Sequence, residues 1–109
     1  MIMENEKELE MSQKTTLEVL GASLPFVTYE ENGVEYIEFN SSASHPPEPM
    51  VNFMQGFELI KGTDKKLVMI NSQEPSPLYP RIANELTWEV EVLESGDVKV
   101  VFSNKKQQD

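Results

Sequence analysis

The sequence predicts an α+β two-layer sandwich, and three observations indicate it. Two stretches have the composition and turn residues of β-hairpins, an unbroken apolar run lies between them, and two proline-rich segments each precede a helical pattern. The predicted order of elements is βαβαββ preceded by one extra strand, which packs two helices on one face of a mixed sheet. We expect one domain, because 109 residues are a usual length for a single core.

The first hairpin signal covers residues 26–39. Residues 26–30 and 34–39 are rich in β-branched and aromatic side chains, and Asn32-Gly33 separates them. Both turn residues accept the positive φ that a type I′ turn requires, so the extra strand is predicted to pair with the next one. Upstream, we expect a short helix over residues 15–20 that ends at Gly21.

The first helix is predicted to begin at the run Pro46-Pro47-Glu48-Pro49. Proline moves the residue before it out of the helical region and suits the first turn of a helix. An apolar stripe with helical spacing follows and predicts the buried face, and Gly62 ends the helix. The residues of the stripe are Met50, Phe53, Met54, Phe57 and Ile60.

The apolar run of residues 67–70 predicts a central strand, because strands covered on both faces lack polar alternation. A second helix is expected near Pro75 to Pro77, with a late start or an irregular shape because Pro80 donates no backbone hydrogen bond. Its predicted buried residues are Leu78, Ile82 and Leu86.

The chain then predicts a closing hairpin. Residues 88–92 alternate between apolar and acidic side chains, residues 94–97 form a turn, and residues 98–102 return as the last strand. The polar ends, residues 1–13 and 103–109, are predicted to be a flexible arm and a flexible tail, which leaves residues 14–102 as the domain.

Residues 36–102 resemble the family called domain of unknown function 2249, which is related in fold to the TusA/SirA sulfur carriers. The resemblance rests on the proline run at 46–49, on Glu74-Pro75-Ser76-Pro77-Leu78-Tyr79 after the central strand, and on the Trp-bearing strand that follows. It implies a TusA-like fold for about two thirds of the chain.

The departures from this resemblance concern chemistry. Sulfur carriers begin their first helix with Cys-Pro-x-Pro, and here Pro46 stands at the cysteine position. The resemblance therefore implies no sulfur-carrier activity. Many family members carry histidines at both helix starts, whereas this chain has Pro49-Met50 and Ser72-Gln73-Glu74 there. No metal or other cofactor is expected.

Composition excludes several classes of function. The net charge of −10 repels phosphate backbones and anionic lipid surfaces, so neither nucleic acid nor a membrane is an expected partner. The absence of cysteine excludes disulfides, thiolate metal sites and cysteine nucleophiles. The first residues lack the basic and apolar pattern of a secretory signal, and we expect a cytoplasmic location.

Both proline-rich starts are expected near the carboxyl ends of strands, where α/β sheets bind ligands. The candidate ligand- or partner-binding residues are His45, Glu48, Glu74, Tyr79 and Arg81. Four of the five also have an ordinary explanation: both carboxylates stabilise helix dipoles, the histidine sits in an exposed loop, and the tyrosine ring anchors an irregular turn. The structural motif comprises Pro46, Pro47, Pro49, Pro75, Pro77 and Leu78.

Two hypotheses for function follow. The first is a non-catalytic binding module that holds a protein partner or a small molecule and has no catalytic residues. The second is an enzyme, or an accessory redox or metabolic domain, in which His45 acts with Glu48 or Glu74 as acid and base; it requires these side chains to converge. The acidic residues Glu30 and Glu31 on the expected edge strand favour a monomer over a homo-oligomer.

Overall fold

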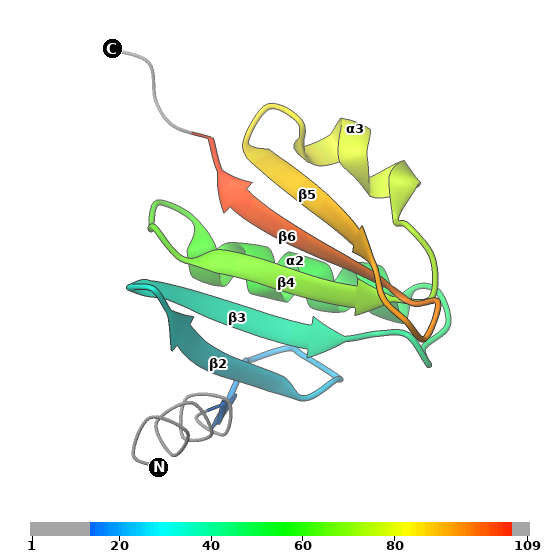
Figure 1. Ribbon diagram of the computed structural model, residues 1–109, viewed down its shortest axis with the longest axis horizontal. Helices are drawn as coiled ribbons and strands as arrows, with labels where there is room; N and C mark the ends of the chain where they lie inside the picture. The colour runs from blue at the N-terminus through cyan, green and yellow to red at the C-terminus, as the bar shows by residue number, and fades with distance from the viewer. Residues whose placement is uncertain (1–13, 106–109) are drawn as a thin grey trace.

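The computed structural model describes residues 14–105, which form one six-stranded sheet with two helical segments (Figure 1). Along the sheet the strands follow the order β1-β2-β3-β4-β6-β5. Strands β3 and β4 are parallel and all other neighbours are antiparallel, so the predicted mixed sheet is confirmed. The strands are β1 (Thr15–Leu17), β2 (Phe26–Glu31), β3 (Val34–Asn40), β4 (Lys66–Asn71), β5 (Leu86–Val92) and β6 (Val98–Asn104).

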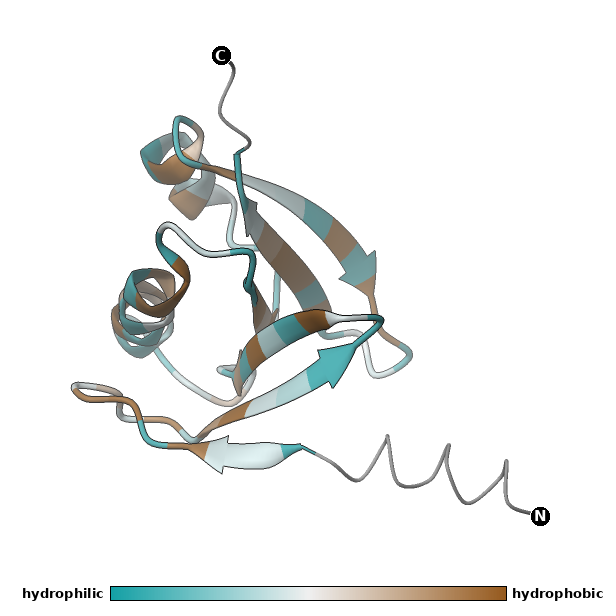
Figure 2. Cartoon of the chain, turned by 90° about the vertical axis from the view of Figure 1, so that its left-hand side faces the viewer, coloured by the Kyte–Doolittle hydropathy of each residue, from teal (hydrophilic) through white to brown (hydrophobic). Residues whose placement is uncertain are grey.

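The helical segments lie on the same face of the sheet (Figure 2). Helix α2 (Glu48–Ile60) runs along β4, behind the sheet in Figure 1. The 3₁₀ turn η1 (Ser76–Leu78) leads directly into the short helix α3 (Tyr79–Ile82). The predicted α+β class is confirmed. No helix in this part of the chain is long and apolar enough to cross a membrane.

The segment before the first hairpin was predicted wrongly. Residues 15–17 form strand β1, which pairs antiparallel with β2, instead of the expected helix. The β-branched Thr15 and Thr16 suit a strand, and they pair in register with Thr28 and Val27 of β2. Two strands therefore precede the βαβαββ order, and β1 covers the edge of β2 that the sequence left open.

The second helical segment is irregular, as predicted. It consists of one 3₁₀ turn and one α-helical turn, because Pro77 and Pro80 lack backbone N–H groups. Leu78, Ile82 and Leu86 are all buried, with exposed fractions of 3% or less, but Leu86 is the first residue of β5.

Helix α2 buries a slightly different stripe from the one predicted. Phe53, Phe57 and Ile60 are buried, whereas Met54 is 41% exposed. Gly56 is buried instead, and a Cβ atom at this position would lie 2.6 Å from Leu67 Cδ1. The helix therefore approaches β4 along a face centred on Gly56, which turns Met54 outward.

A single aromatic and aliphatic core fills the space between the helices and the sheet. Phe53 of α2 meets Phe102 of β6 edge-on, with 4.9 Å between ring centroids, and Phe26 contacts Phe39 across β2 and β3 at 5.1 Å. Further members from all layers are Ile37, Phe57, Ile60, Leu67, Met69, Leu78, Ile82, Leu86, Val98 and Val100.

The domain also extends past its predicted end. Ser103 and Asn104 continue β6, and the backbone N–H of Lys105 donates to the carbonyl oxygen of Glu85 at 3.0 Å. The predicted tail thus begins later than residue 103. The predicted arm, residues 1–13, and the last part of the predicted tail, residues 106–109, lie outside the described residues.

Candidate functional site

The two proline-rich segments meet at one edge of the sheet. Because β3 and β4 are parallel, the loops that follow them leave the sheet at the same end. A pocket of about 280 Å³ lies between these loops. Its lining is mostly apolar and comprises Pro46, Pro47, Pro49, Met50, Met69, Asn71, Gln73, Glu74, Pro75, Pro77 and Leu78.

A buried serine holds the floor of the pocket in place. Ser41, fully buried at the end of β3, donates its backbone N–H to the carbonyl oxygen of Ile70 at 2.7 Å. Its hydroxyl lies 2.8 Å from Asn71 Oδ1, and Asn71 Nδ2 donates to the carbonyl oxygen of Gln73 at 3.0 Å. These contacts join the end of β3 to the end of β4, so the polar groups in the floor already have partners inside the fold.

One wall of the pocket carries a carboxylate supported by two aromatic rings. Tyr79 donates its hydroxyl to Glu74 Oε2 at 2.9 Å, and its ring stacks on Trp88 with 4.4 Å between centroids and 14° between planes. Burial, followed by the neighbouring Glu74 carboxylate, raises the pKa of the Tyr79 hydroxyl. The Tyr79 hydroxyl is thus a donor that holds Glu74 at the rim.

Glu48 has a different role at the start of α2. Its Oε2 accepts a hydrogen bond from the Ser23 hydroxyl at 2.6 Å. That bond lowers the pKa of Glu48, with further contributions from the Ser44 hydroxyl and the charge of His45. Glu48 thereby attaches the β1–β2 connection to the helix.

Buried Asn52 completes this attachment. Its Oδ1 accepts the backbone N–H groups of Ser23 and Leu24 at 3.0 and 3.1 Å, and its Nδ2 donates to the Glu48 carbonyl oxygen at 2.9 Å. Every polar atom of the Asn52 side chain is thus satisfied within the fold. The β1–β2 connection is fixed to the first turn of α2, close to the proline run but outside the pocket.

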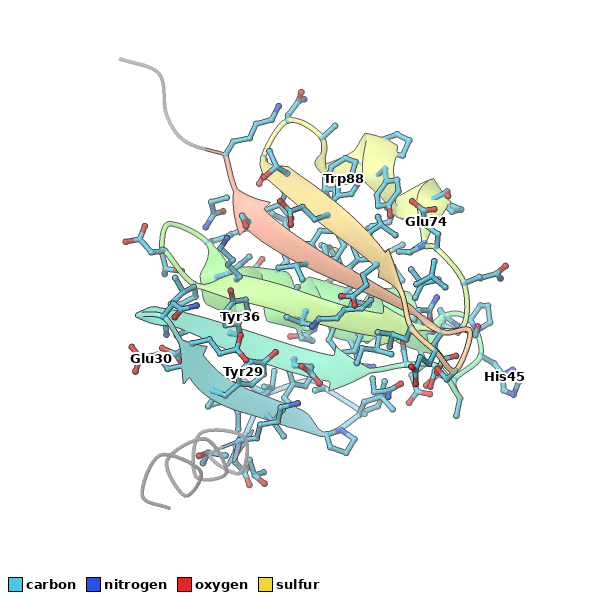
Figure 3. The ribbon with its side chains drawn as sticks, in the orientation of Figure 1. Tyr29, Glu30, Tyr36, His45, Glu74 and Trp88 are labelled. Atoms are coloured by element: carbon cyan, nitrogen blue, oxygen red, sulfur yellow. The ribbon has the colours of Figure 1, made fainter. Side chains whose placement is uncertain are left out.

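His45 projects away from the ribbon (Figure 3). It is exposed, its carbonyl oxygen accepts the Glu48 N–H at 2.9 Å, and it is not among the residues that line the pocket. A carboxylic acid that works at neutral pH has a raised pKa, whereas the pKa of Glu48 is lowered. The two residues are joined by this backbone hydrogen bond, and Glu48 lacks the pKa shift that general acid catalysis by it would require.

The structure divides the candidate residues into three groups. Glu74 and Tyr79 meet at the pocket rim, His45 and Glu48 share a backbone hydrogen bond outside it, and Arg81 is exposed on α3 and does not line the pocket. The residues predicted as a structural motif all line the pocket.

Sequence reasoning missed the pocket floor. Met50 and Met69 were assigned to the core, and Asn71 and Gln73 were not singled out. Their position in the chain could have predicted these lining residues. Met69 and Asn71 lie at the end of a strand that is parallel to β3, next to the loop that carries the second proline run. Buried Ser41 and Asn52 had no comparable signal, because their partners are about 30 residues away in the chain.

The part of the chain described here contains no group of three or more His, Cys, Asp or Glu side chains that could hold a metal ion. Comparison with family models, with curated proteins and with solved structures found no match.

Proposed function

We propose that this chain is a non-catalytic interaction module that holds an apolar group of a protein partner in the pocket between its two proline-rich helix starts. The observation that carries this proposal is the composition of the pocket. Five prolines, two methionines and one leucine line it, and Glu74 is the one charged residue in the lining. A surface of this kind gains free energy by removing an apolar group from water.

The size of the pocket favours a side chain over a cofactor. Pockets for drug-sized ligands and cofactors have volumes of roughly 300 to 1,000 Å³, and this one is about 280 Å³. A nucleotide or flavin would extend far beyond it, whereas one anchoring side chain fits. Interfaces often depend on a few such anchors in well-packed pockets.

The walls of the pocket also favour binding without rearrangement. Proline fixes its own φ and has little side-chain entropy to lose. The floor is held by the contacts of Ser41 and Asn71, and the rim by the stack of Tyr79 on Trp88. A preorganised site spends less of its interaction free energy on ordering itself.

The same proposal includes a TusA-like scaffold without sulfur-carrier chemistry, acting as a monomer in the cytoplasm. The βαβαββ order from β3 to β6 supports the scaffold. A monomer is supported by the edges of the sheet: β1 has three residues, and outer strand β5 carries the acidic residues Glu89 and Glu91. Short or charged edge strands resist pairing with a second chain.

A small molecule bound in the pocket and an enzyme that uses His45 with Glu48 are the other candidates. The charge of His45, which contributes to the lowered pKa of Glu48, is the observation that favours the enzyme. Both side chains stand outside the pocket, and the pKa of Glu48 is lowered, which makes the carboxylate a weak base. The interaction module explains the pocket better.

The proposal is tested by quantitative capture from a native lysate with immobilised wild-type protein, Met50→Trp and Met54→Trp. Met50 lines the pocket, and Met54 is on the same helix but outside the lining. A larger ring at residue 50 fills the pocket, so a genuine partner should be captured by wild type and Met54→Trp and lost by Met50→Trp. Equal melting temperatures of the two variants would show that both fold.

Tyr79→Ala and Glu74→Ala are the corresponding variants at the rim. Each should weaken capture of the same partner while circular dichroism shows an unchanged fold. Partners captured equally by wild type and by every pocket and rim variant would show that the pocket is not the binding site.

A further inference from the structure

The polar part of the pocket rim carries a negative charge, which belongs to the Glu74 carboxylate. Glu74 is exposed, and Tyr79 occupies only its Oε2 atom, so Oε1 has no hydrogen-bond partner among residues 14–105. No lysine or arginine of this part of the chain lines the pocket. An apolar group that enters the pocket therefore meets one uncompensated carboxylate at the entrance.

The neighbouring polar groups do not compete for this role. Asn71 is engaged with Ser41 and with the backbone of Gln73, and Glu48 faces Ser23 outside the pocket. Arg81 is exposed on α3 and does not line the pocket, and Lys99 lies on β6 opposite Ile70. The free oxygen of Glu74 is thus available to an incoming donor.

We propose that the group held in this pocket is an aliphatic or aromatic side chain with a cation beside it, so that the partner presents a lysine or arginine next to its apolar anchor. This inference rests on the proposed function and names the chemistry of the partner. The apolar anchor fills the space between the prolines, and the cation meets Glu74 Oε1. Charge complementarity at a rim sets specificity and the rate of encounter more than affinity, and the net charge of −10 attracts cationic segments from a distance.

Contacts through Tyr79 link Glu74 to Trp88, whose fluorescence can report binding at the rim. The chain has one tryptophan, Trp88, which stacks on the ring of Tyr79, the residue that donates to Glu74. A cation that draws Glu74 toward itself alters the Glu74–Tyr79–Trp88 contacts. Binding at the rim should therefore change the fluorescence of Trp88, whereas binding at a remote surface should not.

The test uses three small probes that share the 3-methylbutyl group: 3-methylbutylammonium, 3-methylbutan-1-ol and 4-methylpentanoate. Affinities are measured from chemical-shift changes of the Met50 and Met69 methyl groups, with Trp88 fluorescence as a second signal. The ammonium should bind about two- to fivefold tighter than the alcohol, as expected for one exposed ion pair, and the carboxylate should bind weakest. Methylammonium, which lacks the apolar group, should leave the methionine signals in place.

Two matched variants test whether Glu74 causes the preference for the ammonium over the alcohol. Glu74→Gln should bring the affinities of the ammonium and the alcohol together while leaving that of the alcohol unchanged. Glu85→Gln removes an equivalent charge at the opposite end of the sheet and should keep the wild-type ratio.

The outcomes separate the two proposals. Equal binding of all three probes in the pocket would overturn the cation preference and leave the interaction module standing. An ammonium preference that survives Glu74→Gln would also overturn it, since the cation would then be held elsewhere. Failure of every probe to shift the Met50 and Met69 signals would contradict the pocket itself.

Discussion

The two ends of the sheet differ in how their polar groups are used. At the carboxyl ends of β3 and β4 lies the small proline-lined pocket, with one charged residue in its lining. At the opposite end lies a wider cleft, which is lined by Lys61, Lys65, Lys66 and Lys105 together with Asp64 and Glu85. The lysine-lined cleft is the larger hollow, at about 950 Å³ compared with about 280 Å³.

Part of the lysine-lined cleft has a role in the fold, at the end of α2. Asn104 Nδ2 donates to the carbonyl oxygens of Ile60 at 2.7 Å and Thr63 at 2.9 Å, which satisfies groups at the end of α2. Lysines near a helix C-terminus also stabilise its dipole. In the proline-lined pocket, by contrast, the lining consists mainly of prolines and methionines. The two hollows therefore differ in the chemistry of their walls, and the smaller one is the one suited to an apolar group.

The largest effect on stability is expected at the lysine-lined cleft. Asn104→Ala removes both hydrogen bonds to the end of α2 and should lower the free energy of unfolding by about 1 to 3 kcal/mol. Urea unfolding measures this loss, and Ser103→Ala on the same strand is the control, with little expected change. If Asn104→Ala were as stable as Ser103→Ala, the Asn104 hydrogen bonds would not stabilise the end of α2, which would contradict the role assigned to them.

At the proline-lined pocket, the aromatic stack should contribute somewhat less. Tyr79→Ala removes the ring that covers Trp88 and should cost about 1 to 2 kcal/mol, because stacked aromatic pairs contribute beyond the area they bury. Tyr79→Phe keeps the stack and should lose about 0.5 kcal/mol with its single hydrogen bond to an exposed carboxylate. Thermal unfolding gives both values, and equal losses would show that the hydroxyl, and not the ring, supports the rim.

A smaller, pH-dependent effect is expected at Glu48. Its pKa is lowered in the folded protein, so its stabilisation is present above the ordinary value of 4.5 and is lost as the pH falls through the lowered pKa. Glu48→Gln should therefore be less stable than wild type at neutral pH, and the two should converge in acid. A difference that stayed constant with pH would contradict the assigned contacts with Ser23 and Ser44.

The smallest effect is expected from the lysines. Lys65 lies 3.6 Å from Glu35, and both side chains are about 40% exposed. Lys65→Ala should change the free energy of unfolding by no more than about 0.5 kcal/mol, because exposed ion pairs contribute little. It should also leave probe binding in the proline-lined pocket unchanged. Loss of that binding in Lys65→Ala would contradict the claim that the proline-lined pocket binds the probe independently of the lysine-lined cleft.

Local patterns predicted most of the fold correctly. The Asn32-Gly33 turn, the apolar run of β4 and the irregular start of α3 are all encoded by neighbouring residues. Strand β1 was missed because three residues form a strand only through pairing with β2. The outward turn of Met54 was missed because it depends on the contact of Gly56 with Leu67 across the core.

The candidate site was predicted in outline and missed in detail. The sequence placed both proline runs at one edge, and parallel β3 and β4 bring them together there. The sequence could not show that the two carboxylates have different roles. Glu48 accepts a hydrogen bond from Ser23 and Glu74 accepts one from Tyr79, and the spacing of residues along the chain does not predict these contacts. Met50 and Met69 were not predicted to line a pocket, because an apolar residue in the core and one in a pocket floor fit the same hydrophobic periodicity.

The most direct test of the central claim is a nuclear Overhauser measurement with 3-methylbutylammonium. The proposed binding mode puts the two methyl groups of the probe between the proline runs, so cross-peaks to the ε-methyl groups of Met50 and Met69 are expected. Cross-peaks confined to Thr63 or Asn84 in the lysine-lined cleft, or to the stacked Tyr29 and Tyr36 of β2 and β3, would show that the apolar group binds elsewhere.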